Sequence, residues 1–280
     1  MKKVILLLAI SLFGSCSAIA ECNYQCVTPY DMNGKFRSVL STITGANFIS
    51  EQVAKKSIKN EIEKYIKGKD LKFDIDSYSS KDLKNGIFKS MSVKGKNVTI
   101  NDIAHLSTLE MKTLCDFNYI KNTKDGAQFV EDFPVSIAIS MNENDINETL
   151  KSNKYQKVID DINRIGFAGF KISSTKVELK SNKFHYIIGF AIPFVKSEKT
   201  ITIIADLKVK DGKIDFDNTK LASKTINFDL SKINFILDYL NPLDFSINIL
   251  NDKGAKVNIN NIEIKDNIIY ADGIAVIPKD

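Results

Sequence analysis

The feature that most constrains this fold is the alternation of apolar and polar residues, which continues over most of the chain after Gly68. Apolar side chains at every second position put one face of an extended strand in a core and leave the other in water. In the run Val135–Met141, for example, the odd positions are apolar and the even positions are Ser, Ala and Ser. Turn sequences such as Asn85–Gly86 and Lys94–Asn97 separate several of these runs. The pattern predicts a large, mainly antiparallel sheet.

One stretch before these strands has the period of an amphipathic helix. It begins at Ser50, a good N-cap, and ends at Gly68, a residue type that commonly stops helices. Between them, apolar residues recur at about every fourth position, and lysines take most of the other side. The apolar stripe consists of Val53, Ala54, Ile58, Ile62, Tyr65 and Ile66. We therefore expect an α+β fold in which a long, highly curved antiparallel sheet wraps around this long helix.

Two further short helical segments interrupt the strands. The first covers residues 143–165, follows the possible cap Asn142 and is broken near Ser152. The second covers Ser231–Leu240 and ends just before an Asn-Pro pair. No Pro- or Gly-rich linker divides this part of the chain, so we expect a single α+β domain over residues 48–280.

The N-terminus has the composition of a secretory signal peptide. Two lysines precede an apolar stretch at positions 4–13, and Ala18–Ala20 provides a small-x-small cleavage site. We expect a signal peptide at residues 1–20, a polar tail at 21–47, and export to the periplasm or cell envelope of a bacterium. The alternative is a degenerate lipoprotein box at Phe13–Cys16, with its cysteine as the lipid anchor.

Three cysteines remain after cleavage at that site: Cys22, Cys26 and Cys115. An oxidising compartment favours a disulfide between two of them and leaves one over. Either the tail is tied to the strand around Cys115, or Cys22 and Cys26 close a local loop, and the sequence leaves both pairings open. The spacing of the first two matches no zinc or redox motif, and no His cluster completes one. We therefore expect no metal site.

The charge balance argues against nucleic acid as a partner. The net charge is +5, and 39 Lys and Arg residues are spread evenly among 34 Asp and Glu. A nucleic-acid site usually concentrates its cations and interleaves them with aromatic residues. Peripheral contact with a membrane surface fits this balance better. After the signal peptide, no apolar stretch approaches the ~18 residues that span a bilayer.

Residues typical of catalysis are scarce. His105 and His185 each lie within an expected strand, and no nucleophile-elbow or phosphate-binding glycine motif occurs. The Asp-x-Asp pairs Asp74–Asp76 and Asp215–Asp217 fall on polar positions of strands, where solvated carboxylates are common. We expect no catalytic residue and no cofactor. A hydrolase or a sugar transferase is the weaker alternative, and it would have to use these histidines or carboxylates.

A one-sided apolar sheet over amphipathic helices can enclose more apolar surface than the helices fill. The remaining volume would be a dry groove suited to acyl chains. The alternative is an ordinarily packed core, which has the same period. The residues expected to line the groove are apolar and come from the helix and from strands in both halves of the chain. They are Val53, Ile58, Ile62, Ile66, Phe73, Ile75, Ile137, Ile139, Tyr186, Ile188, Phe190, Ile203 and Leu207.

Three parts of the chain have an order of elements that is typical of a known family. Val135–Ile162 contains a strand, a polar step, a helix with an apolar-Asn-x-x-Leu pattern and a second helical turn. Asp238–Leu243 matches a short helix, and Val257–Ile264 with Ile268–Val276 matches a pair of final strands. This order resembles the LmeA-like family of cell-envelope phospholipid-binding proteins. The resemblance implies a fold similar to the tubular lipid-binding (TULIP-like) superfamily, with lipid in an internal apolar tunnel, and it transfers no catalytic residue.

We therefore expect an exported protein that binds or carries a phospholipid or glycolipid by burying its acyl chains. Phe167 and Phe170 lie among glycines at residues 166–170 and predict a lip that touches the membrane, with a buried strand start as the alternative. The rival class is a non-catalytic envelope scaffold of the same fold, whose core is filled and whose partner is a protein.

Overall fold

The structure is a computed structural model, and it describes residues 24, 26, 52, 55–56, 59–60, 62–123, 126–165, 171–191, 197–222, 240–248 and 255–279. The predicted signal peptide, most of the predicted tail and most of the predicted helix at Ser231–Leu240 lie outside these residues. So do several residues singled out above: Cys16, Cys22, Val53, Ile58, Phe167 and Phe170.

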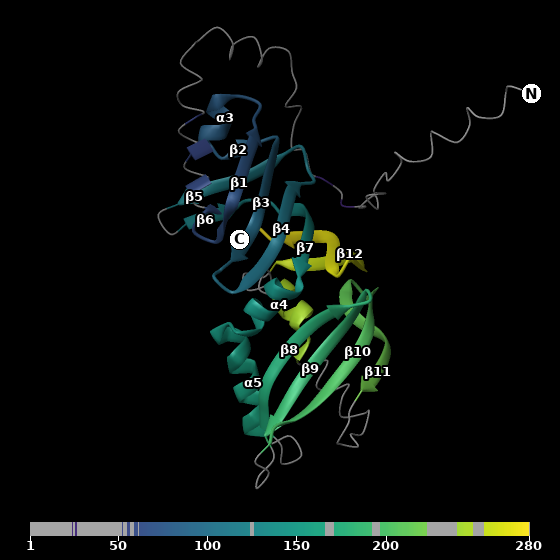
Figure 1. Cartoon of the computed structure of the whole chain (residues 1–280). Helices are drawn as coiled ribbons and strands as arrows, with labels where there is room; N and C mark the ends of the chain where they lie inside the picture. Colours follow the sequence, from purple (N-terminus) through teal and green to yellow (C-terminus); the bar gives the residue numbers. More distant parts are fainter. Residues whose placement is uncertain are drawn as a thin grey trace, which may run out of the picture.

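Six antiparallel strands form the largest described sheet, in the order β1-β3-β4-β7-β13-β12 (Figure 1). Their bounds are β1 Ile66–Asp76, β3 Ser90–Ile100, β4 Ala104–Thr113, β7 Phe133–Asn142, β12 Lys256–Lys265 and β13 Ile268–Ile277. Strand β7 therefore pairs on one side with a strand that precedes it in sequence and on the other with the C-terminal hairpin.

The other strands form two smaller sheets. A four-stranded antiparallel meander has the order β11-β10-β9-β8, with bounds β8 Lys171–Lys180, β9 Lys183–Ala191, β10 Lys199–Lys210 and β11 Lys213–Ala222. A three-stranded sheet contains β2 Ile87–Phe88, β5 Asn118–Thr123 and β6 Gly126–Phe129. The helices with described bounds are short: α3 Ser80–Lys84, α4 Glu143–Leu150, α5 Asn153–Ile165 and α7 Pro242–Asn248.

Tight turns of positive φ set three of the strand registers. Two-residue loops join β8 to β9, β10 to β11 and β12 to β13, and both residues of each loop have φ between 51° and 72°. These loops are Ser181–Asn182, Asp211–Gly212 and Asp266–Asn267. Turns of this kind match the right-handed twist of the flanking strands, and Asn, Asp and Gly adopt them most readily.

The broken helix predicted at residues 143–165 is confirmed as α4 and α5. Asn142 caps α4, because its Oδ1 accepts from the Asp145 amide at 3.0 Å while the Asp145 carboxylate accepts from the Asn142 amide at 3.0 Å. The same carboxylate accepts from the hydroxyl of Ser107 on β4, and Asn142 Nδ2 donates to that hydroxyl at 2.9 Å. The cap therefore ties α4 to the six-stranded sheet.

The helix predicted at Ser50–Gly68 ends earlier than expected. Its described residues are helical as far as Ile62, a turn follows, and β1 begins at Ile66. Gly68 is therefore not a helix stop. A Cβ atom at Gly68 would lie 3.0 Å from Cγ2 of Val98, so the glycine allows β3 to approach β1 closely.

The turn predicted at Lys94–Asn97 is also wrong, because these residues lie inside β3. Asn97 has a φ of 47°, which is a turn-like backbone conformation within a continuous strand. The neighbouring strands explain the difference, since β3 pairs with β1 on one side and β4 on the other through this region. Ladder bonds on both sides outweigh the local turn preference.

Antiparallel strands with short helices confirm the α+β class, but not one long curved sheet around a long helix. The described strands are divided among three sheets, and α5, with 13 residues, is the longest helix with described bounds. The physical reason is that the period of a sequence identifies a strand without identifying its neighbours.

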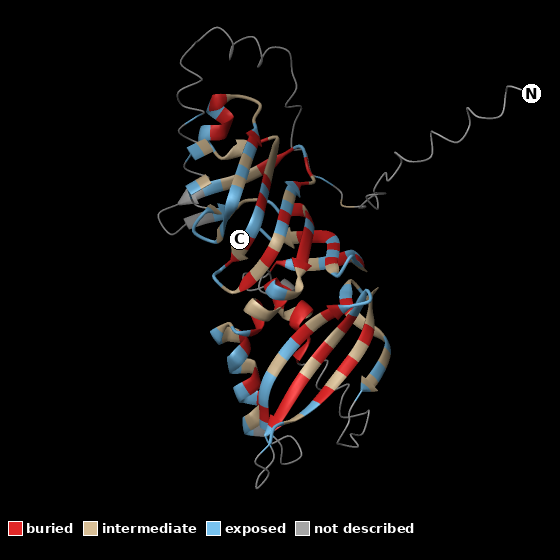
Figure 2. Ribbon diagram, viewed as in Figure 1, coloured by how far each residue is buried: buried red, intermediate tan, exposed pale blue. Residues whose placement is uncertain are grey.

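A single buried apolar cluster includes residues of the six-stranded sheet, the four-stranded sheet, α4, α5 and α7. Helix α4 contacts β4 and β7 as well as β8, and Figure 1 shows it between the two larger sheets. Beyond α4, the amide of Ile259 on β12 donates to the carbonyl of Gly212 in the β10–β11 loop at 2.8 Å. Buried and less buried residues alternate along the strands of both sheets (Figure 2).

We predict that Asp145→Ala destabilises the fold strongly. The carboxylate belongs to a residue that is 9% exposed, and its loss leaves the Asn142 amide and the Ser107 hydroxyl without their acceptor. The free energy of unfolding, measured by urea denaturation, should fall by about 2–4 kcal/mol. The control is Asn144→Ala, an exposed residue in the same helical turn, which should change it by less than about 0.5 kcal/mol. Equal losses in both variants would contradict the role of the cap.

Candidate functional site

The strongest candidate for a ligand site is one face of the six-stranded sheet. The strand registers align one residue from each strand in a row that crosses the whole sheet: Phe73, Val93, Met111, Ile137, Gly273 and Ile259. A second row beside it contains Leu109, Ile139, Ala271 and Ile262. We call these residues the apolar face. None of their side chains is charged or donates a hydrogen bond, so this face can bury apolar groups but offers no polar contact.

A shallow hollow opens on the apolar face where β7, β13 and β12 meet. Its volume is about 10 Å³, and it is lined by Ile137, Ile139, Val257, Ile259, Ala271, Asp272 and Gly273. The missing side chain of Gly273 is required there, because a Cβ atom would lie 2.4 Å from the carbonyl oxygen of Asn258 on β12. The hollow has room for about one water molecule, so it is not a lipid tunnel.

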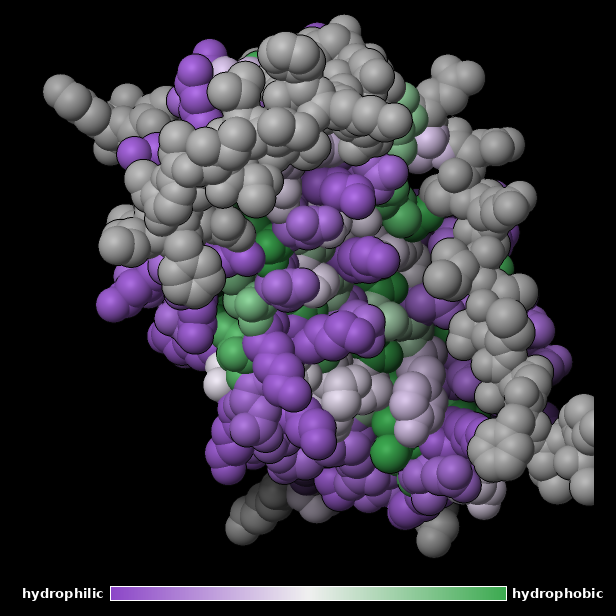
Figure 3. All heavy atoms as spheres, turned by 90° about the horizontal axis from the view of Figure 1, so that it is seen from above, coloured by the Kyte–Doolittle hydropathy of each residue, from purple (hydrophilic) through white to green (hydrophobic). Residues whose placement is uncertain are grey.

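The rest of the apolar face is buried to different degrees. Val93 and Leu109 are 3% and 1% exposed, whereas Phe73 and Met111 are half-buried. Seen from above, hydrophobic residues reach the surface between hydrophilic ones near the middle of the molecule (Figure 3). The half-buried positions are the ones where a ligand can gain contact area without the core being opened.

Four of the predicted groove residues lie together on the six-stranded sheet. Phe73 and Ile75 are on β1, two residues apart and therefore on one side of the strand, and Ile137 and Ile139 are on β7. The described residues of the predicted helix are placed at the start of this sheet. There, Ile62 is in the last helical turn and Ile66 is the first residue of β1, and both are half-buried.

The other predicted groove residues lie on the four-stranded sheet, in a closed core. Tyr186, Ile188 and Phe190 on β9 and Ile203 on β10 are at most 1% exposed, and Leu207 is half-buried. The structure therefore places the two sets on different sheets. It does not bring them together around one open space.

Two buried tyrosines hold α5 and the segment before α7 over the four-stranded sheet. The hydroxyl oxygens of Tyr155 and Tyr186 are 2.6 Å apart, and Tyr155 donates to the carbonyl of Leu240 at 2.9 Å. Tyr186 must therefore donate to Tyr155, because each hydroxyl has one proton. The Tyr155 ring meets the ring of Phe245 edge-on, with centroids 5.0 Å apart. Burial raises the pKa of both hydroxyl groups, so these polar groups stay neutral inside a filled core.

The residues with catalytic side chains are engaged in structural contacts. The Ser107 hydroxyl bonds to Asp145 at the cap of α4, and His105 Nδ1 lies 3.4 Å from the hydroxyl oxygen of Thr99. His185 is a half-buried residue of β9. The structure therefore does not pair Ser107 with His105 as nucleophile and base.

Three of the four carboxylates in the predicted Asp-x-Asp pairs are placed near lysines. The carboxylate of Asp76 is 3.7 Å from Lys89 Nζ, while those of Asp215 and Asp217 lie 3.9 and 2.9 Å from Lys208 Nζ. The bond from Lys208 lowers the pKa of Asp217. In the part of the chain that the structure describes, no group of three or more His, Cys, Asp or Glu side chains is placed to hold a metal ion.

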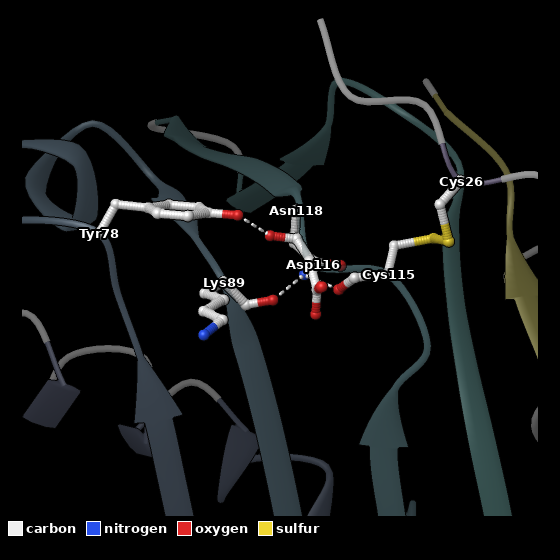
Figure 4. The surroundings of a disulfide bond; sticks show 6 residues. All are labelled: Cys26, Tyr78, Lys89, Cys115, Asp116 and Asn118. Atoms are coloured by element: carbon white, nitrogen blue, oxygen red, sulfur yellow. Dashed lines mark hydrogen bonds between the residues drawn. A yellow bond between two sulfur atoms is a disulfide. The ribbon is translucent and has the colours of Figure 1, made fainter. Parts of the chain in front are cut away.

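A disulfide joins Cys26 to Cys115, 89 residues apart (Figure 4). It is one of the two pairings that the sequence left open, and it ties the N-terminal segment to the chain just after β4. Asn118 links the segment at the disulfide to the one just before β3, because its Nδ2 donates to the carbonyls of Cys115 at 2.8 Å and Lys89 at 3.0 Å. The Oδ1 atom of Asn118 is buried and has no hydrogen-bond partner among the described residues.

A polar cavity of about 230 Å³ lies beside this disulfide. It is lined by Tyr24, Cys115, Phe117, Glu131, Asp132 and Lys279. The Lys279 amide donates to the Asp132 carboxylate at 3.0 Å, and burial together with Asp132 raises the pKa of Tyr24. With two carboxylates, a phenol and an ammonium group, the cavity suits water or a small polar molecule and does not suit an acyl chain.

No protein-family model, curated protein or solved structure matches the chain. Among the described helices, none combines the length and the apolar character that crossing a bilayer would need. The apolar face is therefore the candidate site that the described residues define best.

Sequence reasoning missed five residues of the hollow: Val257, Ile259, Ala271, Asp272 and Gly273. The alternating period predicted three C-terminal strands. The first, at residues 245–250, is wrong, because its described residues belong to α7. The other two are β12 and β13, and the period did not show that β13 pairs with β7. Gly273 was a detectable signal, since a glycine inside a strand often marks a close approach of another backbone.

We predict that Tyr155→Phe costs more stability than Tyr186→Phe. The first change removes the donor to the Leu240 carbonyl and the acceptor of the Tyr186 proton, and should lower the free energy of unfolding by about 1–3 kcal/mol. The second removes only a donor to Tyr155. Both folded-state pKa values are raised above 10.0, so the unfolded chain loses these protons first, and stability should fall as pH rises above 10.0. Urea denaturation of both variants, at neutral and at alkaline pH, tests this, and equal losses would contradict the assigned donor order.

We predict that Cys115→Ser lowers the free energy of unfolding by about 2–4 kcal/mol. The disulfide joins two residues that are 89 apart, and without it the unfolded chain gains conformational entropy. Cys26→Ser should have the same effect. Cys22→Ser is the control and should leave stability unchanged. Peptide mapping without reductant checks the pairing directly, and a peptide pair containing Cys22 and Cys26 would overturn the assignment.

Proposed function

We propose that this chain is a non-catalytic lipid-binding protein of the cell envelope, which takes up the acyl chain of a phospholipid or glycolipid on the apolar face. The observation that carries the proposal is the row of apolar residues that crosses all six strands, with a hollow along it. A ligand that buries on such a face gains free energy from the water it displaces and needs no polar partner.

The dimensions of the apolar face suit a single acyl chain. Six strands spaced about 4.8 Å apart give a row roughly 24 Å long. One leaflet of a bilayer has a hydrocarbon thickness of roughly 15 Å, half of the whole core. One chain can therefore lie along the row within the width of the sheet.

Binding along this row requires side chains to move, because the hollow holds only about 10 Å³. Met91 and Met111 are half-buried on the β1 side of β7, and methionine is the most adaptable apolar side chain. In this proposal, the amphipathic helix predicted to begin at Ser50, whose described helical residues end at Ile62, forms the second wall, as in the tubular lipid-binding superfamily that the chain resembles. The closed core of the four-stranded sheet then serves as a rigid support.

The proposed location agrees with the cysteine chemistry. A disulfide between segments 89 residues apart persists in an oxidising compartment and is rare in a reducing cytosol. This supports the export that the N-terminal sequence predicts.

A second candidate function is that of an envelope scaffold that binds a protein and carries no lipid. The observation that favours it is the closed core of the four-stranded sheet, where Tyr186, Ile188 and Phe190 have no exposed surface. If the six-stranded sheet is equally closed in solution, the hollow is a packing defect and no acyl chain enters.

We predict that the mature chain, purified from envelopes without detergent exchange, carries about one phospholipid or glycolipid, as measured by native mass spectrometry and organic extraction. Met111→Gln keeps the size of a half-buried side chain but places an unpaired amide along the acyl chain, so lipid occupancy should fall about tenfold while the fold persists. Leu207→Gln, a half-buried residue of the four-stranded sheet, is the control and should keep its lipid. A bare mass that stays bare after incubation with liposomes would favour the scaffold.

A further inference from the structure

Four exposed lysines gather on the other side of the six-stranded sheet. The register places Lys69 directly opposite Lys96 and Lys72 directly opposite Lys94. Lys94 and Lys96 are two residues apart on β3, so they point to one side of the strand. The next residues along, Phe73 and Val93, are paired on the apolar face. We call these four residues the lysine face.

A bulge in β1 is what puts Lys69 and Lys72 on the same side. They are three residues apart, and in a regular strand they would point to opposite faces. The register between β1 and β3 shifts on both sides of Lys69, and Asp70 has a φ of 53°. The extra residue restores the alternation, so both lysines face the partners Lys96 and Lys94.

The lysine face is poorly neutralised. Lys94 forms an ion pair with Glu110 on β4, but no carboxylate of the described residues lies within 4.0 Å of Lys69, Lys72 or Lys96. Elsewhere some surface lysines have acidic partners, as Lys183 has in Asp206 at 2.5 Å, and others, such as Lys210 and Lys213, have none among the described residues. Like charges placed directly across a ladder destabilise a sheet. Two such pairs side by side therefore cost stability, and the ion pair between Lys94 and Glu110 offsets only part of this cost.

Protection of a sheet edge explains only half of this arrangement. Lysines on an edge strand discourage pairing with other chains, and β1 is an edge of the six-stranded sheet. Strand β3 is different, because β1 and β4 pair with it on its two sides. Lys94 and Lys96 therefore protect no edge, and their place opposite two further lysines needs another reason.

We infer that the lysine face docks the protein onto the anionic surface of a phospholipid bilayer. A sheet face that presents four lysines, of which only Lys94 is paired with a carboxylate of the described residues, matches a surface of many diffuse negative charges, and each lysine near such a surface contributes separately. Nucleic acid is the less suitable polyanion. Its sites favour arginine and stacking aromatic residues, whereas only two of the chain's 39 cationic residues are Arg and the lysine face contains no aromatic residue.

Docking and acyl-chain binding are separable, because the lysine face and the apolar face are opposite sides of one sheet. The inference does not depend on the proposed function. Met111→Gln should keep vesicle binding while lipid occupancy falls, and a lysine variant should show the reverse. The two proposals can therefore fail independently.

The experiment is co-sedimentation of the mature chain with vesicles of phosphatidylcholine, either pure or mixed with phosphatidylglycerol. The wild-type protein should bind only the anionic vesicles at about 0.1 M salt. It should be released at about 1 M salt, where the screening length falls from about 10 Å to about 3 Å. Equal binding to neutral and anionic vesicles would overturn the inference. So would displacement from the vesicles by an equal phosphate concentration of a single-stranded DNA oligonucleotide.

The decisive variant is Lys96→Glu, because we expect it to weaken vesicle binding and at the same time to stabilise the fold. It changes the lysine face by two charges, so binding to anionic vesicles should weaken about 30-fold. At the same time, it places an acidic side chain opposite Lys69, so the melting temperature should rise. A variant that binds less because it unfolds cannot show this combination.

Lys213→Glu is the matched control. Lys213 is exposed on β11 and lies opposite another lysine, Lys210, so the change in net charge and the cross-strand relation are the same. Its melting temperature should also rise, but its vesicle binding should stay within about twofold of wild type, a change of less than ~0.5 kcal/mol. Wild-type binding by Lys96→Glu, or an equal loss in both variants, would overturn the inference.

Discussion

The ladder between β7 and β13 is the interaction on which the rest of the structure depends. It pairs ten residues of each strand, from Phe133 with Ile277 to Asn142 with Ile268, although the strands are far apart in sequence. Such pairing is slow to form, because a long loop must close before any hydrogen bond is gained. Once formed, it places the C-terminal hairpin beside strands from the first half of the chain. The hollow and the contact of β12 with the β10–β11 loop both require it.

The six-stranded sheet has two chemically different faces because its side chains alternate and its registers are aligned. Phe73 and Val93 pair on one side, and their neighbours Lys72 and Lys94 pair on the other. One extra residue in β1, beside Asp70, keeps Lys69 with the other lysines. This bulge therefore decides on which face of the sheet Lys69 lies. The proposed binding of acyl chains and the inferred docking to a bilayer depend on this separation of faces.

The apolar faces of the two larger sheets are covered in different ways. The four-stranded sheet is closed by helices, and inside its core Tyr186 donates to Tyr155, which donates to the carbonyl of Leu240. A buried polar pair of this kind favours one packing arrangement and makes it rigid. The six-stranded sheet instead carries Met111, whose side chain adapts, and Gly273, which has none. If the chain binds a ligand in its interior, the second arrangement is the one that can accommodate it.

The sequence by itself determined the strand at Val135–Met141 and the broken helix at 143–165, because both depend on periods and caps within a short segment. It misplaced the end of the first helix, because a glycine such as Gly68 can either end a helix or allow two strands to lie close together. Only the tertiary structure decided that Ile137 and Tyr186 lie on different sheets. A period shows which side chains share one face of a strand. Which strand lies next to it depends on pairing and packing between segments far apart in the chain, and those interactions leave no local pattern.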